Sequence, residues 1–314
     1  MKIVITGALG HIGSRLARMI PARYPGSEVI LIDDMSTQRY PSLFDLPEGA
    51  AFKFMEADVT AANLEPVFEN ADAVVQLAAI TDATSSFERR EEVERINLSA
   101  TARVAEACAA TGAPLIFPSS TSVYGTQKDV VDEDCGPEDL QPQSPYAETK
   151  LREEAVLAEL TGANRFRHVT MRLGTIFGTS PGMRFHTAVN KFCWQAVMGL
   201  ELTVWRSAYD QKRPYLELDD ACRAFFHAMD NDLFDGRVYN VLTLNATVRD
   251  IVEAIRRHVP ALEVGFVDSE IMNQLSYEVA RKRFTDTGFD FSGDLDQSIG
   301  ASVALLRNAN GSPG

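Results

Sequence analysis

The chain has no long apolar run, no cluster of basic residues and no closely spaced pair of cysteines. No stretch approaches the ~20 consecutive apolar residues that a membrane-spanning helix needs, and the opening MKIVITG contains no secretion signal. We therefore expect a cytoplasmic protein without a membrane partner. A formal net charge of −14 without a basic stripe also argues against DNA or RNA as a partner.

Cysteine is scarce, with four residues in a chain of 314. They are far apart and form no C-x-x-C motif, so the sequence indicates neither a disulfide framework nor structural zinc, and we predict no metal site. A hydrophobic content of 45% and a charged content of 24% are typical of a globular protein. The length suits one large α/β unit, or a main domain with a smaller lobe.

What the chain does have is a regular alternation of short apolar runs and helical patterns. Near-continuous hydrophobicity within the runs is typical of strands buried on both faces, as in a parallel sheet. Helical patterns at 91–111 and 145–160 lie between such runs. The repeated β-α units predict a doubly wound parallel sheet, the Rossmann arrangement. The predicted strands are 2–6, 29–33, 52–55, 73–77, 114–120 and 168–173.

Three glycines, Gly7, Gly10 and Gly13, follow the first predicted strand at the start of a predicted helix. Glycine permits a tight turn and lets backbone N–H groups approach a pyrophosphate, and the helix N-terminus adds a partial positive charge. A glycine triplet alone is a weak signal, and a plain tight turn is the alternative. Strand, glycines and helix nevertheless occur here in the order of a dinucleotide-binding unit.

The second predicted strand ends in two acids, Asp33 and Asp34. A carboxylate at this position accepts hydrogen bonds from the adenosine ribose and repels a 2′-phosphate, so the pattern favours NAD over NADP. We predict that Asp33 is the ribose ligand and that the second acid begins a solvated loop. Asp58, after the third strand, either binds the adenine amino group or caps the segment that follows.

A tyrosine and a lysine, Tyr146 and Lys150, share one face of the predicted helix 145–160. A free tyrosine has a pKa near 10. A nearby ammonium, a helix N-terminus and a cationic nicotinamide ring would each lower that pKa. Ser120 ends a strand where open α/β sheets bind ligands, so its hydroxyl can share the proton of a reacting alcohol. An exposed helix face is the alternative for Y-x-x-x-K alone, but the glycine motif and the upstream serines favour an acid–base device.

With these motifs the sequence resembles the extended short-chain dehydrogenase/reductase family, and within it the nucleotide-sugar epimerases and dehydratases. The resemblance covers essentially residues 1–260. It implies Tyr146 as the base, Lys150 as its electrostatic partner and nicotinamide-ribose ligand, and Ser120 as the hydroxyl partner. The segments that carry it are TGALGHIG, LAA, INLSAT, PSSTSVYG and YAETK, with weaker similarity in RLGTIFG, MRFHTAVNKF, RPYLELDD and VYNVLT. The implied NAD contacts are Gly7, Gly10, His11, Ile12, Gly13, Asp33, Asp58, Val59, Leu77, Ala78, Ala79, Asn97, Tyr146 and Lys150.

Within this family, dehydratases usually carry a glutamate two residues before the tyrosine of V-Y-G, where this chain has Ser122. Loss of water needs an acid to protonate the leaving hydroxyl, so dehydration is disfavoured. Small residues in this block resemble 4-epimerases of UDP-hexoses and UDP-uronates. We predict C4 epimerisation of a nucleotide-diphosphate sugar through a 4-keto intermediate. The alternatives are a net dehydrogenase of a sugar or other small alcohol, a dehydratase, and a catalytically silent scaffold.

The second half of the chain supplies the candidate substrate ligands. Asn190 and Arg213 match residues that contact the sugar-nucleotide diphosphate, although a helix-face hydrogen bond and a surface ion pair are the alternatives. Arg184 either contacts a phosphate or substrate carboxylate or braces the lobe. Thr175 and Glu217 depart from the family pattern and leave the sugar open. The predicted substrate contacts are Ser120, Thr121, Thr175, Arg184, Asn190 and Arg213.

The domain organisation follows from a change of rhythm after residue 173, where a Gly/Pro-rich loop, a helix and further short strands appear. We predict that residues 1–173 and about 211–242 form the NAD-binding Rossmann domain. Residues 174–210 and 243–314 are predicted to form a smaller C-terminal α/β lobe for substrate. The two helices at 91–111 and 145–160 carry apolar residues on more than one side; such helices pair across a dimer in the family, so we expect a homodimer.

Overall fold

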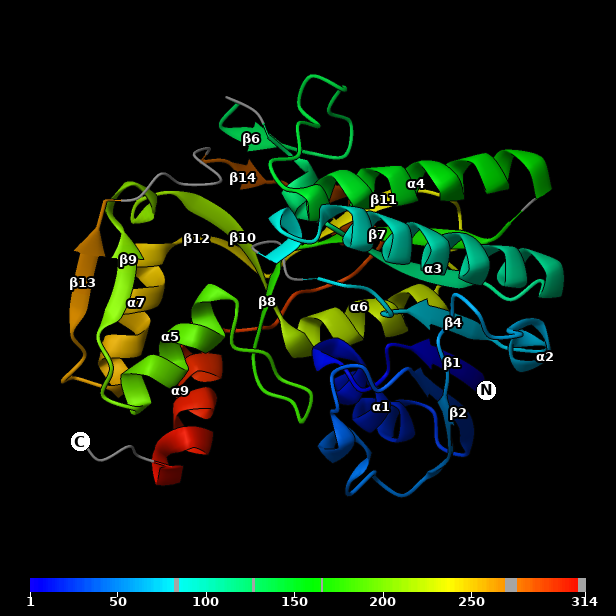
Figure 1. Ribbon diagram of the computed structural model, residues 1–314, viewed down its shortest axis with the longest axis horizontal. Coiled ribbons are helices and arrows are strands. Elements are labelled where there is room, and N and C mark those ends of the chain that lie inside the picture. The colour runs from blue at the N-terminus through cyan, green and yellow to red at the C-terminus, as the bar shows by residue number, and fades with distance from the viewer. Residues whose placement is uncertain (82–84, 126–127, 165, 269–275, 310–314) are drawn as a thin grey trace.

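The computed structural model describes residues 1–81, 85–125, 128–164, 166–268 and 276–309. Its centre is a seven-stranded, all-parallel sheet with the order β11-β7-β5-β4-β1-β2-β3 (Figure 1). The doubly wound α/β prediction is therefore confirmed. The strands are β1 (Lys2–Thr6), β2 (Ser27–Asp33), β3 (Ala50–Glu56), β4 (Ala73–Gln76), β5 (Leu115–Ser120), β7 (His168–Leu173) and β11 (Val238–Val241).

The sheet changes direction of growth between β1 and β4, which pair through Ile5 and Val75. From β1 the chain adds β2 and β3 on one side, and from β4 it adds β5, β7 and β11 on the other. At such a switch point the connections leave toward opposite faces and open a crevice at the carboxyl ends of the strands. The topology thus places a ligand site beside the turns that follow β1 and β4.

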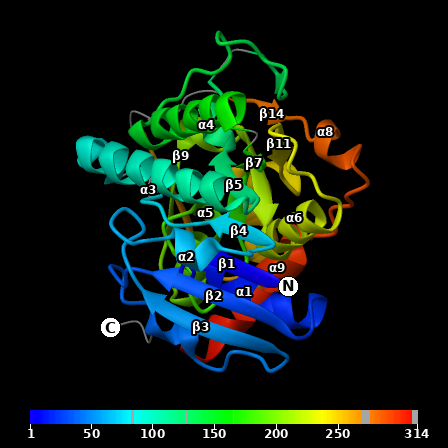
Figure 2. The same cartoon turned by 90° about the vertical axis from the view of Figure 1, so that its right-hand side faces the viewer.

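Helices cover both faces of the sheet (Figure 2). Two of them, α1 (His11–Arg23) and α6 (Leu218–Asp230), bury Leu16, Ile20 and Phe225 against one face. The other face packs against α2 (Glu65–Phe68), α3 (Arg90–Thr111) and α4 (Pro145–Asn164), with Val104 and Leu157 fully buried. Gly112 ends α3 with a left-handed φ of 75°, the usual role of glycine after a helix.

One strand prediction needs correction, because β3 is not buried on both faces. It lies at the edge of the sheet and pairs only with β2. Each of its residues is half-buried or exposed, whereas the inner strands are mostly buried, and Phe54 is 39% exposed. An edge strand receives cover from one neighbour only, so the apolar run FKFM reflects β propensity rather than complete burial.

A second, smaller assembly lies beside the large sheet and has its own core, which includes Phe177, Ile251 and Val303. It contains a three-stranded sheet, β12-β10-β8, and a two-stranded sheet, β13-β9. Its elements are β8 (Thr175–Phe177), α5 (Ala188–Val197), β9 (Leu202–Trp205), β10 (Lys212–Glu217), β12 (Leu244–Thr247), α7 (Val248–His258), β13 (Val264–Val267) and α9 (Leu295–Leu306). The remaining elements are β6 (Val130–Val131), which pairs with β14 (Glu278–Val279), the helix α8 (Lys282–Thr285) and the 3-10 turns Tyr40–Leu43, Ser85–Phe87, Thr121–Val123, Arg206–Ala208 and Arg307–Ala309.

The chain crosses between the two assemblies several times. Within 211–242, β10 belongs to the small sheet, whereas α6 and β11 belong to the layers of the large sheet. Phe284 and Phe289, near the C-terminus, also pack into the core under the large sheet. The predicted division into two domains remains a prediction. In the part of the chain that the structure describes, no helix is both long enough and apolar enough to cross a membrane.

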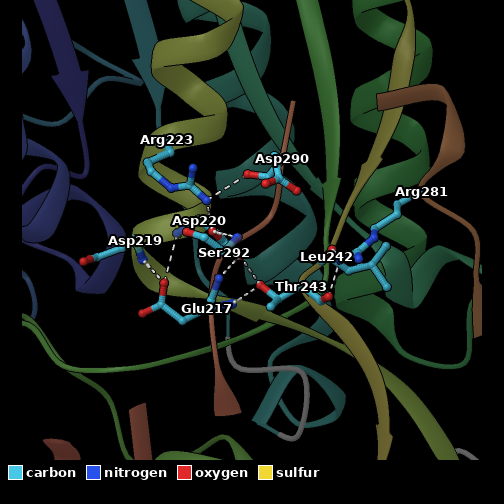
Figure 3. A network of polar contacts seen from close by, with 10 residues as sticks. Glu217, Asp219, Asp220, Arg223, Leu242, Thr243, Arg281, Asp290 and Ser292 are labelled. Carbon is cyan, nitrogen blue, oxygen red and sulfur yellow. Dashed lines mark hydrogen bonds and ion pairs between the residues drawn. The ribbon is translucent and has the colours of Figure 1, made fainter. Parts of the chain in front are cut away.

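A buried carboxylate joins these crossing segments (Figure 3). Asp220, in the first turn of α6, is 1% exposed and accepts hydrogen bonds from Thr243 Oγ1 at 2.7 Å, Ser292 N at 3.1 Å and Gly293 N at 3.0 Å. Arg223 forms an ion pair with the same carboxylate. Glu217 accepts from the N–H groups of the first turn and caps α6. Asp220 therefore holds α6, the turn after β11 and the C-terminal segment together.

We expect Asp220→Ala to lower the free energy of unfolding by roughly 3 kcal/mol, because it leaves buried donors and a cation without their acceptor. Thermal unfolding followed by circular dichroism measures this. The matched control is Asp219→Ala, at the neighbouring position, whose ion pair with Arg15 joins side chains that are 42% and 37% exposed. The control should cost less than about 1 kcal/mol. Equal losses for the two variants would contradict the assignment.

Candidate active site

Two adjoining cavities lie at the carboxyl ends of the strands. The larger has a volume of about 690 Å³ and the smaller about 340 Å³. They share part of the glycine turn after β1 and part of the loop after β4, together with Arg184 and His186. The larger cavity extends toward the ends of β2 and β3, and the smaller toward β5 and α4. Together they form one elongated site across the switch point.

The glycine turn after β1 fits a dinucleotide because side chains are excluded from it. Gly7 has a φ of +61°, and a Cβ there would lie 2.5 Å from the backbone nitrogen of Ala78. A Cβ on Gly13 would lie 2.6 Å from the carbonyl oxygen of Ala8. The turn therefore packs against the loop after β4, and α1 begins at His11 without a side-chain cap from Gly10. Its first N–H groups lack intrahelical acceptors, as a pyrophosphate site requires.

Asp33 and Asp58 were predicted to bind the adenosine half of the cofactor, and both of them line the larger cavity. Asp33 accepts hydrogen bonds from Leu9 N at 3.0 Å and Met35 N at 3.1 Å, and burial raises the pKa of its carboxyl group despite these bonds. It thus holds the end of β2 against the glycine turn while each oxygen keeps a second lone pair. Asp58 accepts from the backbone and hydroxyl of Thr60. Both of the predicted uses of Asp58 are compatible with this geometry.

The sequence analysis missed Arg39, which also lines the larger cavity. Its Nη1 atom is buried and makes no hydrogen bond to the described residues, and it lies 3.8 Å from the position that a Cβ on Gly10 would take. Burial lowers the pKa of its guanidinium, and the nearby Arg184 lowers it further. The sequence signal that could have identified Arg39 is a basic residue six positions after the predicted ribose ligand, Asp33. Its position suits contact with the phosphates of a dinucleotide.

The start of α4 fixes the predicted acid–base pair. Ser144 Oγ accepts from Ala147 N at 3.2 Å, and Pro145 is the first helical residue, as helix N-termini favour. Tyr146 and Lys150 then point into the smaller cavity from the first turns of the helix. Lys150 Nζ lies 5.9 Å from the centre of the Tyr146 ring and 4.6 Å from the centre of the Phe117 ring.

Electrostatics around this pair differ from the expectation of a lowered tyrosine pKa. Burial raises the pKa of Tyr146, and the Lys150 ammonium and a hydrogen bond with Ser120 offset only part of that effect. Burial alone lowers the pKa of Lys150, but the neighbouring carboxylate of Glu153 and the Tyr146 oxygen raise it above the usual value. Without ligands the phenol is therefore protonated and the amine charged at neutral pH.

The serines after β5 complete the smaller cavity. Ser120 Oγ and Ser122 Oγ lie 2.8 Å apart, and both side chains line it. Thr175 and Arg184, two of the predicted substrate contacts, also line it, and their roles toward substrate remain predictions. Among the described residues, no aspartate or glutamate lines this cavity. The described part of the chain also contains no group of three or more His, Cys, Asp and Glu residues placed to hold a metal ion.

The loop between β8 and α5 closes over the glycine turn and carries Arg184. His11, at the start of α1, meets Ser180 Oγ of this loop at 2.7 Å. Burial, together with the charges of Arg39 and Arg184, lowers the pKa of His11 to about 3, so the imidazole is neutral at physiological pH. A neutral ring leaves the positive charge of this region to the two arginines.

Most predicted cofactor residues line one of the two cavities. Those in the smaller cavity include the glycines with His11 and Ile12, and those in the larger include Val59, Leu77, Ala78 and Ala79. Asn97 lines neither cavity; its amide accepts from Ile80 N at 2.8 Å and donates to Ile80 O at 3.0 Å. It is buried and supports the loop after β4 from behind.

Three predicted substrate residues also lie outside the two cavities: Thr121, Asn190 and Arg213. Thr121 donates its hydroxyl proton to Leu173 O at 3.1 Å, and Asn190 donates to Arg184 O at 3.2 Å. Arg213 lies over the ring of Tyr277, with 5.4 Å between Cζ and the ring centre. In this structure these side chains serve internal contacts, and their roles toward substrate remain predictions.

Comparison with known proteins identifies the family. The chain is 26% identical over 300 residues to a trifunctional UDP-glucose 4,6-dehydratase/UDP-4-keto-6-deoxy-D-glucose 3,5-epimerase/UDP-4-keto-L-rhamnose-reductase of Arabidopsis thaliana; the match covers 92% of this chain but 44% of that protein. It is 26% identical over 319 residues to a UDP-glucose 4-epimerase of Mycolicibacterium smegmatis, covering 98% and 99% of the two chains. The crystal structure of a Bacillus cereus UDP-glucuronic acid 4-epimerase in complex with UDP-glucuronic acid and NAD matches at 24% identity with a TM-score of 0.85, covering 98% and 100%.

The family assignment rests on a match that extends through the whole large sheet. The model of the family described as "NAD dependent epimerase/dehydratase family" covers residues 3–241, from the first strand to the end of β11. This range includes the glycine turn, the serines after β5, and the Tyr146–Lys150 pair. The resemblance inferred from the motifs is confirmed: the chain is a member of the NAD-dependent epimerase/dehydratase family.

Proposed function

We propose that the protein is an NAD-dependent 4-epimerase of a nucleotide-diphosphate sugar, acting through a transient 4-keto intermediate. The observation that carries this proposal is the smaller cavity. It brings Ser120, Tyr146 and Lys150 next to the glycine turn, and among its described lining residues there is no carboxylate. The first feature suits oxidation of a sugar hydroxyl beside a dinucleotide. The second disfavours loss of water, which needs an acid.

The residues of the site fit NAD, because the glycine turn has no room for a Cβ at Gly7 or Gly13 and would leave backbone N–H groups open to a pyrophosphate, and Asp33 stands where a 2′-phosphate would meet a negative charge. When bound, NAD⁺ supplies a hydride acceptor and a positive charge near the phenol. Tyr146 Oη is positioned to take the proton of the sugar hydroxyl and to return it after the keto sugar has turned. Ser120 Oγ, a hydrogen-bond partner of the phenol, shares that proton.

Lys150 contributes in two ways. Its ammonium favours the phenolate form of Tyr146, and each pKa unit that it offsets corresponds to about 1.4 kcal/mol. It also lines the cavity next to the glycine turn, where it can bind the nicotinamide ribose. Since burial keeps the pKa of Tyr146 above its usual value, the active base forms only when further positive charge enters the site.

A UDP-hexose or UDP-uronate is the proposed substrate class. The Mycolicibacterium relative is a UDP-glucose 4-epimerase, and the Bacillus structure contains UDP-glucuronic acid. In this chain Arg184 lines both cavities, where it can bind a phosphate or a sugar carboxylate. Ser122 and Thr175 add uncharged hydroxyl groups to the same space.

We further propose a cytoplasmic homodimer. In support of the dimer, α3 and α4 lie side by side at the outside of the sheet (Figures 1 and 2). Two ion pairs, Arg90–Glu148 and Arg152–Glu94, join α3 to α4, so the two helices form one continuous surface. The four free cysteines are consistent with a reducing compartment. Light scattering should give twice the chain mass of 34.6 kDa, and a single chain mass would contradict the dimer.

The purified protein should interconvert a pair of C4-epimeric nucleotide sugars when UDP-, dTDP- and GDP-sugars are supplied in turn and the products are followed by NMR. Tyr146→Phe should lower kcat by roughly 10²- to 10⁴-fold, as loss of a general base does, while bound NAD is retained. Solvent deuterium should not enter C4, because the same hydride returns. A stoichiometric rise of absorbance at 340 nm with excess NAD⁺ would instead establish a net dehydrogenase.

Gly7→Ala should abolish NAD retention, because the new Cβ would lie 2.5 Å from backbone atoms that form the cradle. NAD released from denatured protein, measured against protein concentration, gives the result. Gly112→Ala is the matched control: Gly112 also has a positive φ, of +75°, but a Cβ there meets no atom within 4 Å. The control should lose about 1 kcal/mol of stability and keep its NAD. Loss of NAD in both variants would contradict the steric explanation.

A further inference from the structure

The lysine of the acid–base pair also forms a buried ion pair with a residue that the proposed mechanism does not use. Glu153, one helical turn after Lys150 on α4, has its Oε2 atom 3.1 Å from Lys150 Nζ. The side chains are 1% and 5% exposed, so both charges are withdrawn from water. Burying two ions costs several kcal/mol for each, and the attraction between them repays this only with good geometry and additional hydrogen bonds. A pair at this position requires an explanation.

One additional hydrogen bond reaches Glu153, and a second one holds its donor; they come from two other elements. Thr101, on α3, donates its hydroxyl proton to Glu153 Oε1 at 2.5 Å. Gln76, the last residue of β4, donates from Nε2 to Thr101 Oγ1 at 3.0 Å. Gln76 itself lines the smaller cavity. A continuous chain of contacts therefore runs from the cavity through β4 and α3 to Glu153 and ends on Lys150.

The other charged groups nearby have separate partners or positions. Glu154, the next residue of α4, forms an ion pair with Arg172 of β7 at 2.7 Å and accepts from Ser119 at 2.5 Å. Arg184 also acts on the phenol and lines the cavity, as do His11 and His186. These groups are unchanged when Glu153 alone is replaced. The effect of its charge can therefore be isolated.

We propose that Glu153 is a positioning residue for the acid–base pair, which holds the Lys150 ammonium between the rings of Phe117 and Tyr146 and limits the positive field that this ammonium exerts on the phenol. The proposal rests on the proposed function, because it assigns the pair its catalytic role. The net charge of the Lys150–Glu153 ion pair decides how strongly it acts on the phenol. Lys150 and Glu153 together are neutral, so the pair favours phenolate less than a lone ammonium would.

The physical consequence is a tyrosine that stays protonated until a cation enters the site. Glu153 acts on the Tyr146 phenol in the same direction as burial and against Lys150. It also supports the charged form of Lys150, which burial opposes. The carboxylate thus makes formation of the base depend on the bound cofactor while keeping the lysine charged over a wide pH range. Removing it should move both titrations to lower pH.

The test compares Glu153→Gln with wild type as holoenzyme, by the pH dependence of kcat/KM on the nucleotide sugar that the substrate panel identifies. The acid limb should move to lower pH by about one unit or more, since a neighbouring like charge shifts a pKa by that amount. The alkaline limb should move the same way, because the ammonium loses its counter-ion. A merely structural role would lower Tm or activity but leave both limbs in place, and that result would overturn the proposal.

The matched control is Glu148→Gln, the same substitution on the same helix at a position whose side chain is 42% exposed and paired with Arg90. It should leave the profile unchanged. Should Glu153→Gln fail to fold, Glu153→Asp keeps the charge but withdraws it from Lys150, and a smaller shift in the same direction is expected. An unshifted profile of a folded Glu153→Asp would count against the proposal.

A second readout does not depend on the substrate. In protein labelled with ¹³C at tyrosine Cζ, the resonance missing from Tyr146→Phe reports the ionisation of Tyr146. Its midpoint should be lower in Glu153→Gln than in wild type. A shifted midpoint with no epimerase activity on any sugar would overturn the proposed function and leave the electrostatic role standing. An unshifted midpoint in an active epimerase would overturn the role of Glu153 alone.

Discussion

The site depends on a close backbone contact between two turns that belong to neighbouring strands. The turn after β1 lies so near to the loop after β4 that no side chain fits at Gly7. This contact can form only where β1 and β4 are adjacent and parallel, with both carboxyl ends at the same edge. It aligns the N-terminus of α1 with the crevice, and it places the residues that follow β4 along both cavities. The glycine requirement is thus a property of the pair of strands.

The protonation states of Tyr146 and Lys150 depend on how neighbouring charges offset the effect of burial. The Tyr146 phenol and the Lys150 amine are both buried, and burial disfavours the ionised form of each. Different neighbouring groups offset the effect of burial on the two side chains. Lys150 is kept charged by Glu153, whereas Tyr146 receives only partial help from Lys150 and Ser120. Without ligands, a charged amine therefore lies beside a protonated phenol.

The small assembly is held to the large sheet by polar as well as apolar contacts. Asp220 binds segments that are more than 70 residues apart in the sequence, as its bond to Gly293 shows. The loop that carries Arg184 is fixed by Gly182 N, which donates to Ser14 Oγ of α1 at 3.0 Å. Gly182 N thus ties the loop that carries Arg184 to α1, whereas Asp220 joins α6 to the turn after β11 and to the C-terminal segment.

The fold class, six of the seven strands of the large sheet and the acid–base motif were accessible from the sequence, because they depend on local patterns. Alternating apolar runs and helices specify parallel β-α units, glycines mark a turn, and a spacing of four places Tyr146 and Lys150 on one helix face. The exposed edge of β3 was not accessible, since burial depends on what covers a strand rather than on its composition. The return of the chain to the large sheet at α6, and not at β10, depends likewise on strand pairing across long separations.

The same distinction applies to single side chains in the site. Asn97, Thr121 and Asn190 match family motifs, yet a motif does not show whether a side chain lines a cavity or supports its wall from behind. Arg39 and Glu153 carry no motif, and only the packing of separate elements brings Arg39 to the glycine turn and Thr101 to Glu153. The sequence by itself determined which groups are proposed for the chemistry, because local spacing brings Tyr146 and Lys150 onto one helix face. Tertiary structure alone decided the burial and the neighbouring charges that set their protonation, because those arise from contacts between residues far apart in the chain.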